Sequence, residues 1–182
     1  MHPSTFLLRA LLPAVMLCAA TARAGDDVSE VARLQRAGQT TLALQRAEQF
    51  LAAQPGDAAM RFLKGTLLAD AGRGTEAMAQ WRALTEDHPD LAEPYNNIAA
   101  LHAARGDYGE ALAALQTALR NRPDYATALE NLGQVHLMLA RQAYASALRA
   151  VPDNEALGRK LAYLRDAPAA PSPSDAATRR NP

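Results

Sequence analysis

The chain has 182 residues, and its 19 lysines and arginines balance 19 aspartates and glutamates, so the formal net charge at neutral pH is zero. This balance argues against non-specific binding of nucleic acid or of anionic membranes, because both need a clear surplus of basic residues. Alanine and leucine dominate and aromatic residues make up only 5%, a composition that favours helix along the whole chain.

The first 24 residues have the pattern of a secretory signal peptide. A basic start leads into an apolar run from Ala10 to Ala20, and Ala22-Arg23-Ala24 then supplies a small-x-small cleavage site. The run is shorter than the about 20 residues that a membrane span needs. We expect cleavage between Ala24 and Gly25 and a periplasmic or secreted protein, with an uncleaved N-terminal anchor as the alternative.

The only cysteine, Cys18, lies inside this apolar run. Leu17 precedes it, whereas a lipid-attachment site needs a small residue there, so Cys18 is interpreted as an ordinary residue of the leader. Cleavage would remove it, which excludes disulfides, thiolate metal sites and a cysteine nucleophile from the mature chain. Cleavage would also remove Arg9 and Arg23 and no acid, which leaves a net charge near −2 from 17 basic and 19 acidic residues.

Four residue types recur at intervals of 34 along the rest of the chain. The columns are Gly38, Gly72 and Gly106; Ala43, Ala77 and Ala111; Glu76 and Glu110; and Pro55, Pro89 and Pro123. A period of 34 in a helix-favouring composition is typical of tetratricopeptide repeats. The sequence resembles this family over about residues 25–165, and the third repeat carries its pattern most fully, with Tyr95, Ile98, Ala99, His102, Gly106, Asp107, Tyr108, Glu110, Ala111, Leu115, Ala118 and Pro123.

The resemblance implies an all-α fold, in which antiparallel helix pairs stack into a right-handed superhelix with a concave inner face. The expected units are about 25–57, 58–91, 92–125 and a shortened 126–152, followed by a capping helix over 153–166 and a disordered tail over 167–182. Glycine at each turn would adopt positive φ and end the first helix, and proline would end the second. Small residues at Gly65, Ala99 and Gly133 would let paired helices approach closely.

The fourth unit departs from the repeat, because Pro152 follows Pro123 by 29 residues. The residues of its first helix follow those of the third repeat by 34. Tyr144 and Ala147 match Leu115 and Ala118 only if five residues are missing from the turn between the two helices. The sequence favours a very tight bend near 140–142, and one continuous helix is the alternative. A continuous helix would expose its apolar face to a second chain. The pattern Asp153-Asn154-Glu155 then predicts the start of the capping helix.

The motifs that could indicate catalysis or metal binding are better explained by the repeat structure. His102 and His136 share one repeat column, but leucine fills that column in the first two repeats, so packing is a better interpretation than a metal pair. The stretch from Gly72 to Ala77 matches a dinucleotide fingerprint but follows a helix, whereas the fingerprint requires a strand. We expect a non-catalytic chain without cofactor or metal.

Family members commonly bind a partner in the groove lined by the first helix of each repeat. The residues that the resemblance places there are Phe62, Thr66, Asn96, Asn97, Glu130, Asn131 and Gln134. Asn97 and Asn131 occupy a column where members often use asparagine to bind a ligand's backbone; a tolerated polar residue on a solvated face is the alternative. The basic clamp of members that bind a C-terminal carboxylate is not assembled, so an extended or helical segment with polar and apolar groups is expected.

The sequence thus predicts a protein-interaction scaffold or adaptor of the bacterial cell envelope that binds protein partners. No nucleic acid, and no membrane contact beyond an uncleaved anchor, is expected. The alternative is a self-associating structural module, a homodimer formed through the shortened fourth repeat.

Overall fold

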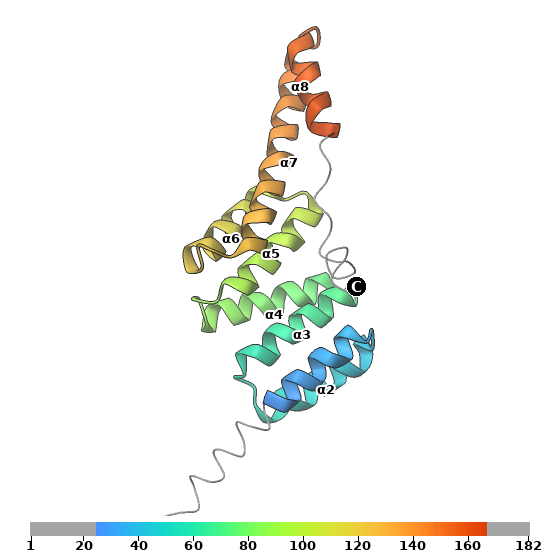
Figure 1. Cartoon of the computed structure of the whole chain (residues 1–182), viewed down its shortest axis with the longest axis vertical. Coiled ribbons are helices and arrows are strands. Elements are labelled where there is room, and N and C mark those ends of the chain that lie inside the picture. Colours follow the sequence, from blue (N-terminus) through green and yellow to red (C-terminus); the bar gives the residue numbers. More distant parts are fainter. Residues whose placement is uncertain (1–24, 167–182) are drawn as a thin grey trace, which may run out of the picture. The chain divides into compact units, whose positions relative to one another are not determined.

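The computed structural model describes residues 25–166, and every regular element in that part of the chain is an α-helix. The all-α prediction is therefore confirmed. A helix over 25–36 precedes α2 (Thr40–Ala53), α3 (Ala58–Asp70), α4 (Gly74–Asp87), α5 (Ala92–Arg105), α6 (Tyr108–Asn121), α7 (Ala126–Ala150) and α8 (Glu155–Asp166) (Figure 1). The expected signal peptide over 1–24 and tail over 167–182 lie outside the described residues.

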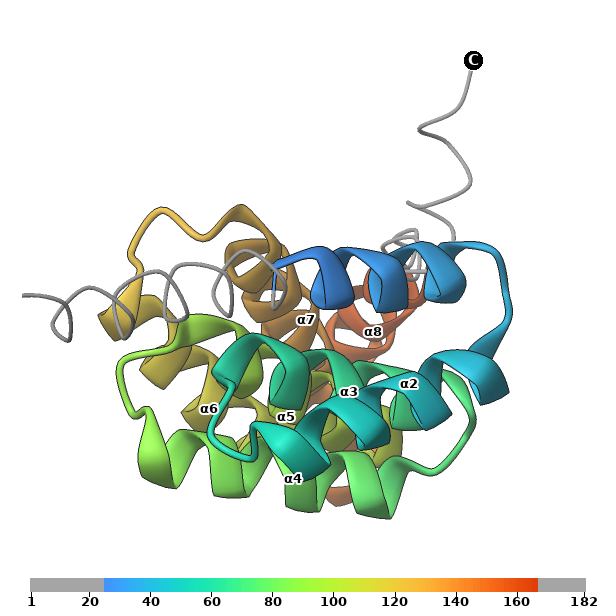
Figure 2. The same ribbon diagram turned by 90° about the horizontal axis from the view of Figure 1, so that it is seen from below.

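The chain divides into two compact units, with the division inside α4 after Leu84. In the first unit the helix over 25–36 reverses direction into α2, and α3 packs beside α2 (Figure 2). Asp57 accepts a hydrogen bond from the Met60 backbone N–H at 2.7 Å and so caps the start of α3. The apolar faces of these helices are buried at Val31, Leu34, Ala43, Leu44, Ala47, Phe50, Met60, Leu67, Leu68, Ala77, Met78 and Trp81.

The recurring glycines end three helices in the same way. Gly38, Gly72 and Gly106 have φ of 70°, 74° and 83°, the left-handed region that was expected. After each of them the next backbone N–H bonds back to a carbonyl of the preceding helix, as Arg73 does to Leu68 at 2.8 Å. These bonds satisfy carbonyls that the end of a helix leaves without partners.

Replacing Gly106 by alanine should destabilise the protein by about 1–2 kcal/mol, because a Cβ makes the left-handed conformation unfavourable. The measurement is the midpoint of urea unfolding followed by helical circular dichroism. Gly109→Ala is the matched control, since Gly109 lies within α6 at an ordinary φ with open space around a Cβ placed there; it should stabilise the helix slightly. Equal midpoints for the two variants would contradict the role assigned to the glycine column.

The second unit has a core shared by α5, α6 and the first half of α7. The Asn121 side chain at the end of α6 is bonded to the loop before α5, since its Nδ2 donates to the Pro89 carbonyl at 2.7 Å. The buried residues of this core are Ala92, Ala99, Ala111, Leu115, Ala118, Ala128 and Val135. Small side chains predominate here, which allows α6 to lie close to α5 and α7, as the repeat pattern predicts.

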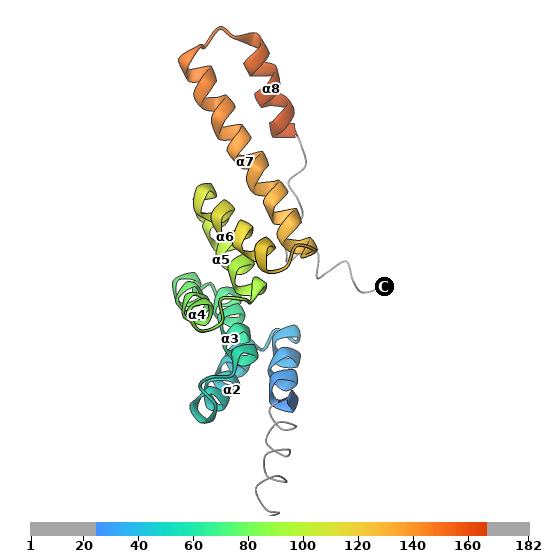
Figure 3. The same cartoon turned by 90° about the vertical axis from the view of Figure 1, so that its left-hand side faces the viewer.

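The favoured prediction for the fourth repeat, a tight bend near 140–142, is wrong. α7 is one unbroken helix of 25 residues, and Figure 3 shows it running on past α6. Position 140 lies 34 residues after Gly106 but holds alanine, which would adopt positive φ only at a cost of about 1–2 kcal/mol. From 134 to 150 the chain contains neither glycine nor proline, so nothing interrupts the helix.

α8 turns back along the second half of α7 (Figure 3) and corresponds to the capping helix expected over 153–166. The Asn154 side chain accepts from the Leu157 backbone N–H at 3.1 Å, which confirms the predicted cap. Arg141 of α7 donates from Nε and Nη2 to the Leu164 carbonyl, with the Nε bond at 2.8 Å. Lys160 also lies over the Tyr144 ring at 5.6 Å. These contacts join α8 to α7.

Candidate protein-binding surface

The predicted groove residues fall in both units. Phe62 and Thr66 lie on α3 in the first unit, whereas Asn96 and Asn97 lie on α5 of the second. The remaining candidates, Glu130, Asn131 and Gln134, lie on α7. Each unit is therefore described by itself.

Three asparagines of the second unit form a chain of hydrogen bonds between neighbouring helices. Asn131 Nδ2 donates to Asn96 Oδ1 at 2.9 Å, and Asn96 Nδ2 donates to Asn97 Oδ1 at 3.4 Å. Asn96 is buried, with 4% of its surface exposed, and Asn97 and Asn131 are half-buried. We call these three residues the asparagine ladder. It holds α5 and α7 in register, because breaking it would leave a buried carboxamide without its partners.

The ladder retains hydrogen-bonding capacity at both ends. A carboxamide can donate two bonds and accept two, and the bonds above use the oxygen of Asn97 and the nitrogen of Asn131. The Asn97 NH2 group and the Asn131 oxygen take no part in these bonds, so they are a donor and an acceptor on half-buried side chains. This pair matches the amide N–H and carbonyl of a peptide backbone.

Charged and aromatic residues lie near the start of α5 and α7. Glu93 forms an ion pair with Arg122 at 2.7 Å, and the Arg122 guanidinium lies 3.9 Å from the centre of the Tyr125 ring. Burial raises the pKa of the Tyr125 hydroxyl above its usual value, and the nearby Glu93 carboxylate adds to this. Tyr125 therefore stays neutral at physiological pH. Arg122 and Tyr125 were not predicted from the sequence, because neither position belongs to a column of the repeat pattern.

Phe62 and Thr66 serve packing and backbone contacts within the first unit. The Phe62 ring lies 6.5 Å from the Trp81 ring, and the Phe62 carbonyl accepts from Trp81 Nε1 at 3.3 Å. Thr66 Oγ1 donates to the same carbonyl at 3.2 Å, a bond that serine and threonine commonly make within a helix. Both side chains are half-buried, and the Thr66 hydroxyl and the Phe62 carbonyl are hydrogen-bonded within the unit.

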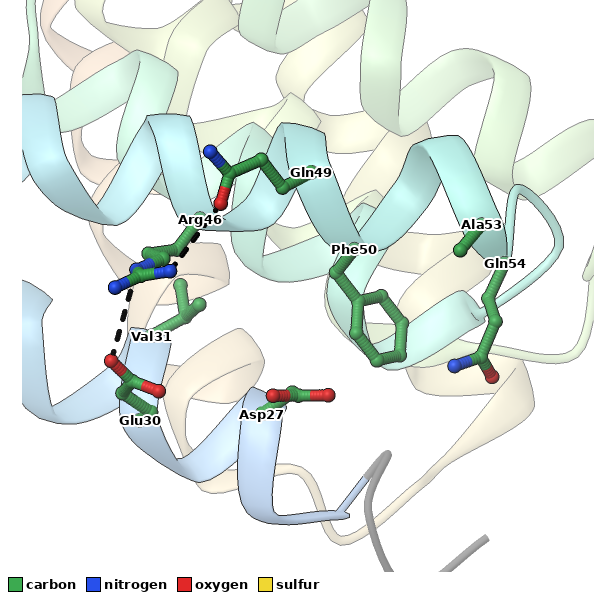
Figure 4. Close-up of a pocket in the computed structure, with 8 residues that line it drawn as sticks. All are labelled: Asp27, Glu30, Val31, Arg46, Gln49, Phe50, Ala53 and Gln54. Carbon is green, nitrogen blue, oxygen red and sulfur yellow. Dashed lines mark hydrogen bonds and ion pairs between the residues drawn. The ribbon is translucent and has the colours of Figure 1, made fainter. Parts of the chain in front are cut away.

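A shallow hollow in the first unit was not anticipated from the sequence. It lies between the helix over 25–36 and α2 (Figure 4). Its volume is about 280 Å³. Arg46 crosses it, with its Nε 3.9 Å from Glu30 and its Nη1 3.4 Å from Gln49. The lining also includes Asp27, Val31, Phe50, Ala53 and Gln54. Its size is at the lower limit of small-molecule sites, and its charged groups largely engage one another.

The two histidines of the shared column differ in their surroundings. The His102 side chain is 12% exposed, and its Nδ1 lies 3.6 Å from Asp107 Oδ2. His136 is exposed on α7. Within residues 25–166, no three histidine, cysteine or acidic residues lie close enough together to hold a metal ion. Nor does any helix in this range have the length and apolarity to cross a membrane.

The helix pairs, the left-handed glycines and the close approach of small residues are the features of one repeat family. Models described as tetratricopeptide repeat match residues 57–124 and 97–155. The chain belongs to the tetratricopeptide-repeat family. The second match extends over residues 126–152, so the shortened fourth repeat is included in the region that resembles the family.

Similar proteins are found in a mammal and in a bacterium. Superkiller complex protein 3 of Mus musculus is 30% identical over 134 residues, which are 70% of this chain but 9% of that protein. The chain spans less than a tenth of this relative's length. Among solved structures, YrrB, described as a TPR protein with an unusual peptide-binding site, is 28% identical with a TM-score of 0.54, covering 58% of this chain and 55% of YrrB.

A thermophilic tetratricopeptide protein of Thermus thermophilus has a TM-score of 0.58 at 18% identity. The match covers 78% of this chain and 98% of the thermophilic one. At this identity the likeness shows the fold alone. Tetratricopeptide proteins in general mediate protein–protein interactions, and this chain shares their architecture.

Proposed function

We propose that this chain is a non-catalytic scaffold of the bacterial cell envelope that binds a segment of a partner protein along the first helices of its repeats. The observation that supports this most directly is the asparagine ladder of Asn96, Asn97 and Asn131. It presents a fixed donor and a fixed acceptor on adjacent helices. Groups held in place before binding lose less conformational entropy when a ligand arrives.

The chemistry of the surface favours an extended or helical peptide segment over an anionic tail. Carboxamides bind neutral backbone groups, and the adjacent exposed side chain on α7 is Glu130, which would repel an acidic ligand. The Arg122 guanidinium near the start of α5 is already paired with Glu93. A partner with backbone groups free to pair and some apolar surface therefore suits the site best.

The envelope location rests on the leader pattern over 1–24. The two-helix repeats need no cofactor to form their core, and a mature chain without cysteine would fold independently of the redox state of its compartment. Export would bring the asparagine ladder into contact with proteins of the envelope. The test is detection of the chain in a periplasmic fraction with Gly25 as its N-terminus; retention of residues 1–24 in the cytoplasm would contradict the proposal.

The double variant Asn97→Ala, Asn131→Ala should weaken partner binding about tenfold, since two hydrogen bonds are lost at about 0.5–1.5 kcal/mol each. Asn96 is kept, but the variant removes both of its side-chain partners, so it should also be less stable than wild type by about 1–3 kcal/mol. The tagged variant and wild type would be compared by quantitative mass spectrometry of the envelope proteins that they retain.

Gln116→Ala, an exposed position on α6, is the matched control for this comparison. Unfolding curves should show that the double variant remains folded at the assay temperature. Unchanged recovery of the same partner by the double variant would contradict the proposed site.

A further inference from the structure

The fourth repeat contains the sequence of both helices but not the turn between them. Counting back from the proline that ends each repeat by 12, 8 and 5 residues gives the three packing columns of the second helix. In the fourth repeat these positions are Ala140, Tyr144 and Ala147. All three lie in the second half of α7, which continues straight on from the first half.

The same columns are buried wherever the turn is intact. Their members in the first three repeats are 0–8% exposed: Ala43, Ala47 and Phe50; Ala77, Trp81 and Leu84; Ala111, Leu115 and Ala118. In the fourth repeat, Ala140, Tyr144 and Ala147 are only half-buried. The second-helix face of this repeat is therefore incompletely covered.

The first-helix face of the fourth repeat is open as well. In the second repeat, Trp81 of α4 fills the space over Gly65 of α3. Gly133 occupies the same column on α7, but it is exposed and no atom lies within 4 Å of a Cβ placed there. One turn earlier, the Leu129 side chain is 48% exposed. The two faces cannot meet within one chain, because α7 does not bend.

The open positions form one stripe along α7: Leu129, Gly133, His136, Ala140, Ala143 and Ala147. They follow the alternating spacing of four and three residues that keeps a seam on one side of paired helices. The stripe is symmetric about residue 138, the midpoint of the 25-residue helix. In an antiparallel pair of copies, position 129 would face 147, position 133 would face 143, and position 136 would face 140.

This register gives the fourth repeat a cover over its glycine, as in a complete repeat. Gly65 meets Trp81 in the second repeat, whereas the equivalent Tyr144 of the fourth repeat lies beside α8, with Lys160 over its ring. The symmetric pairing instead sets Gly133 opposite Ala143 of the other copy. The second half of α7 in one copy would thus cover the open glycine of the other.

We propose that two copies of this chain associate through α7 in an antiparallel, two-fold pair, in which the second half of each α7 covers the first half of the other. A 25-residue helix is about 37 Å long, and its pairing along the full length would bury on the order of 1,000 Å² in total, the lower limit for a specific dimer. The stripe carries neither acidic residues nor lysine or arginine that would have to be desolvated.

The pairing leaves the asparagine ladder accessible. Asn131 precedes Gly133 by two residues, so it points about 200° away around the helix. α8 contacts α7 through Arg141 and Tyr144, which lie about 120° and about 60° around the helix from the centre of the stripe. The dimer would thus present two partner-binding faces, which raises avidity for a repeated or dimeric partner. The dimer could fail while the binding surface stands, because the two use opposite sides of α7.

Cysteine cross-linking tests the antiparallel register. In the full chain with Cys18→Ser, the double variant Leu129→Cys, Ala147→Cys should form a covalent dimer on mild oxidation, seen on a non-reducing gel. Within one chain these positions are about 27 Å apart, far beyond the reach of a disulfide. Each single variant should give less than about a tenth of that dimer, because identical positions are equally far apart. Equal dimer from the single variants, or no dimer from the double variant, would overturn the proposal.

Restoring the turn provides an independent test. Insertion of Gly-Asp-Tyr-Gly-Glu, copied from 106–110, between Leu139 and Ala140 gives the fourth repeat its full length. The second helix could then cover Gly133 within the same chain, and light scattering at tens of micromolar should show the mass halved relative to wild type. A wild-type chain that is monomeric at this concentration, or an insertion variant that stays dimeric, would contradict the proposal.

The variant Gly133→Leu should also produce the monomer, since its side chain would occupy the stripe and its Cβ has no atom of its own protomer within 4 Å. Gly158→Leu in α8, another helical glycine with open space around it, should remain dimeric. An identical response of the two variants would count against the stripe as the interface.

Discussion

Replacing Gly65 by leucine should destabilise the first unit by about 2–3 kcal/mol. A Cβ at this position of α3 would overlap Trp81 Nε1 and would lie 2.7 Å from Cδ1 and 2.8 Å from Cε2. The indole cannot readily move aside, because Trp81 is 2% exposed and donates to the Phe62 carbonyl. Close packing transmits this overlap to the neighbouring residues.

The midpoint of urea unfolding should fall by roughly 1 M or more for this variant, given slopes of about 1–3 kcal/mol per molar urea. Gly158→Leu is the control, since it makes the same replacement in a helix with no neighbour within 4 Å. A Gly65→Leu midpoint equal to that of the control would show that α3 and Trp81 are not in the contact described.

Truncation of Trp81 to alanine should cost about 3–5 kcal/mol, the usual range for a buried large aromatic. The variant loses the contact over Gly65, the ring pair with Phe62 and the bond to its carbonyl. The loss of helical signal on heating should begin at a markedly lower temperature than in wild type. A loss below about 1 kcal/mol would contradict the place given to Trp81 in the core.

The two substitutions should not be additive. Trp81→Ala opens the space that a leucine at position 65 needs, so the double variant should be more stable than the sum of the single effects predicts. Coupling energies of about 0.5–3 kcal/mol are usual for residues in contact. Strict additivity would mean that the clash at Gly65 is with another group.

The repeat pattern predicted most of the fold because each column has a local physical role. Gly72 ends a helix with positive φ whatever lies around it, and Asn154 caps a helix through its own side chain. Gly65 was identified as a close-approach position, although the pattern did not say that Trp81 fills the space. Features of this kind depend on residues that are close in the sequence, so they can be predicted before the contacts between helices are known.

The bend expected near 140–142 was wrong because the repeat pattern was given more weight than local helix preference. Ala140, Gln142 and the residues around them are good helix formers, and the glycine that ends the other first helices is absent. A repeat can therefore be recognised by its columns while its turn no longer exists. The exposed Gly133 is the structural consequence.

The candidate surface could be predicted only in part. The 34-residue spacing placed Asn97 and Asn131 in one column, but the buried role of Asn96 between them depends on how α5 meets α7. Phe62 was assigned to the groove by its column, whereas its ring pairs with Trp81 and its carbonyl binds the indole. Contacts between helices decide which residues of a column remain available, and a single sequence does not record them.

The most direct test of the proposed scaffold is photo-crosslinking in living cells from Asn97, with Gln116 on the exposed side of α6 as the control. A photoreactive residue at 97 leaves the Asn131–Asn96 bond intact, and mass spectrometry would identify what is captured. We expect one dominant envelope protein to be trapped from position 97 and to be absent from position 116. Equal capture from both positions, no capture, or capture of a second copy of this chain from position 97 would contradict it.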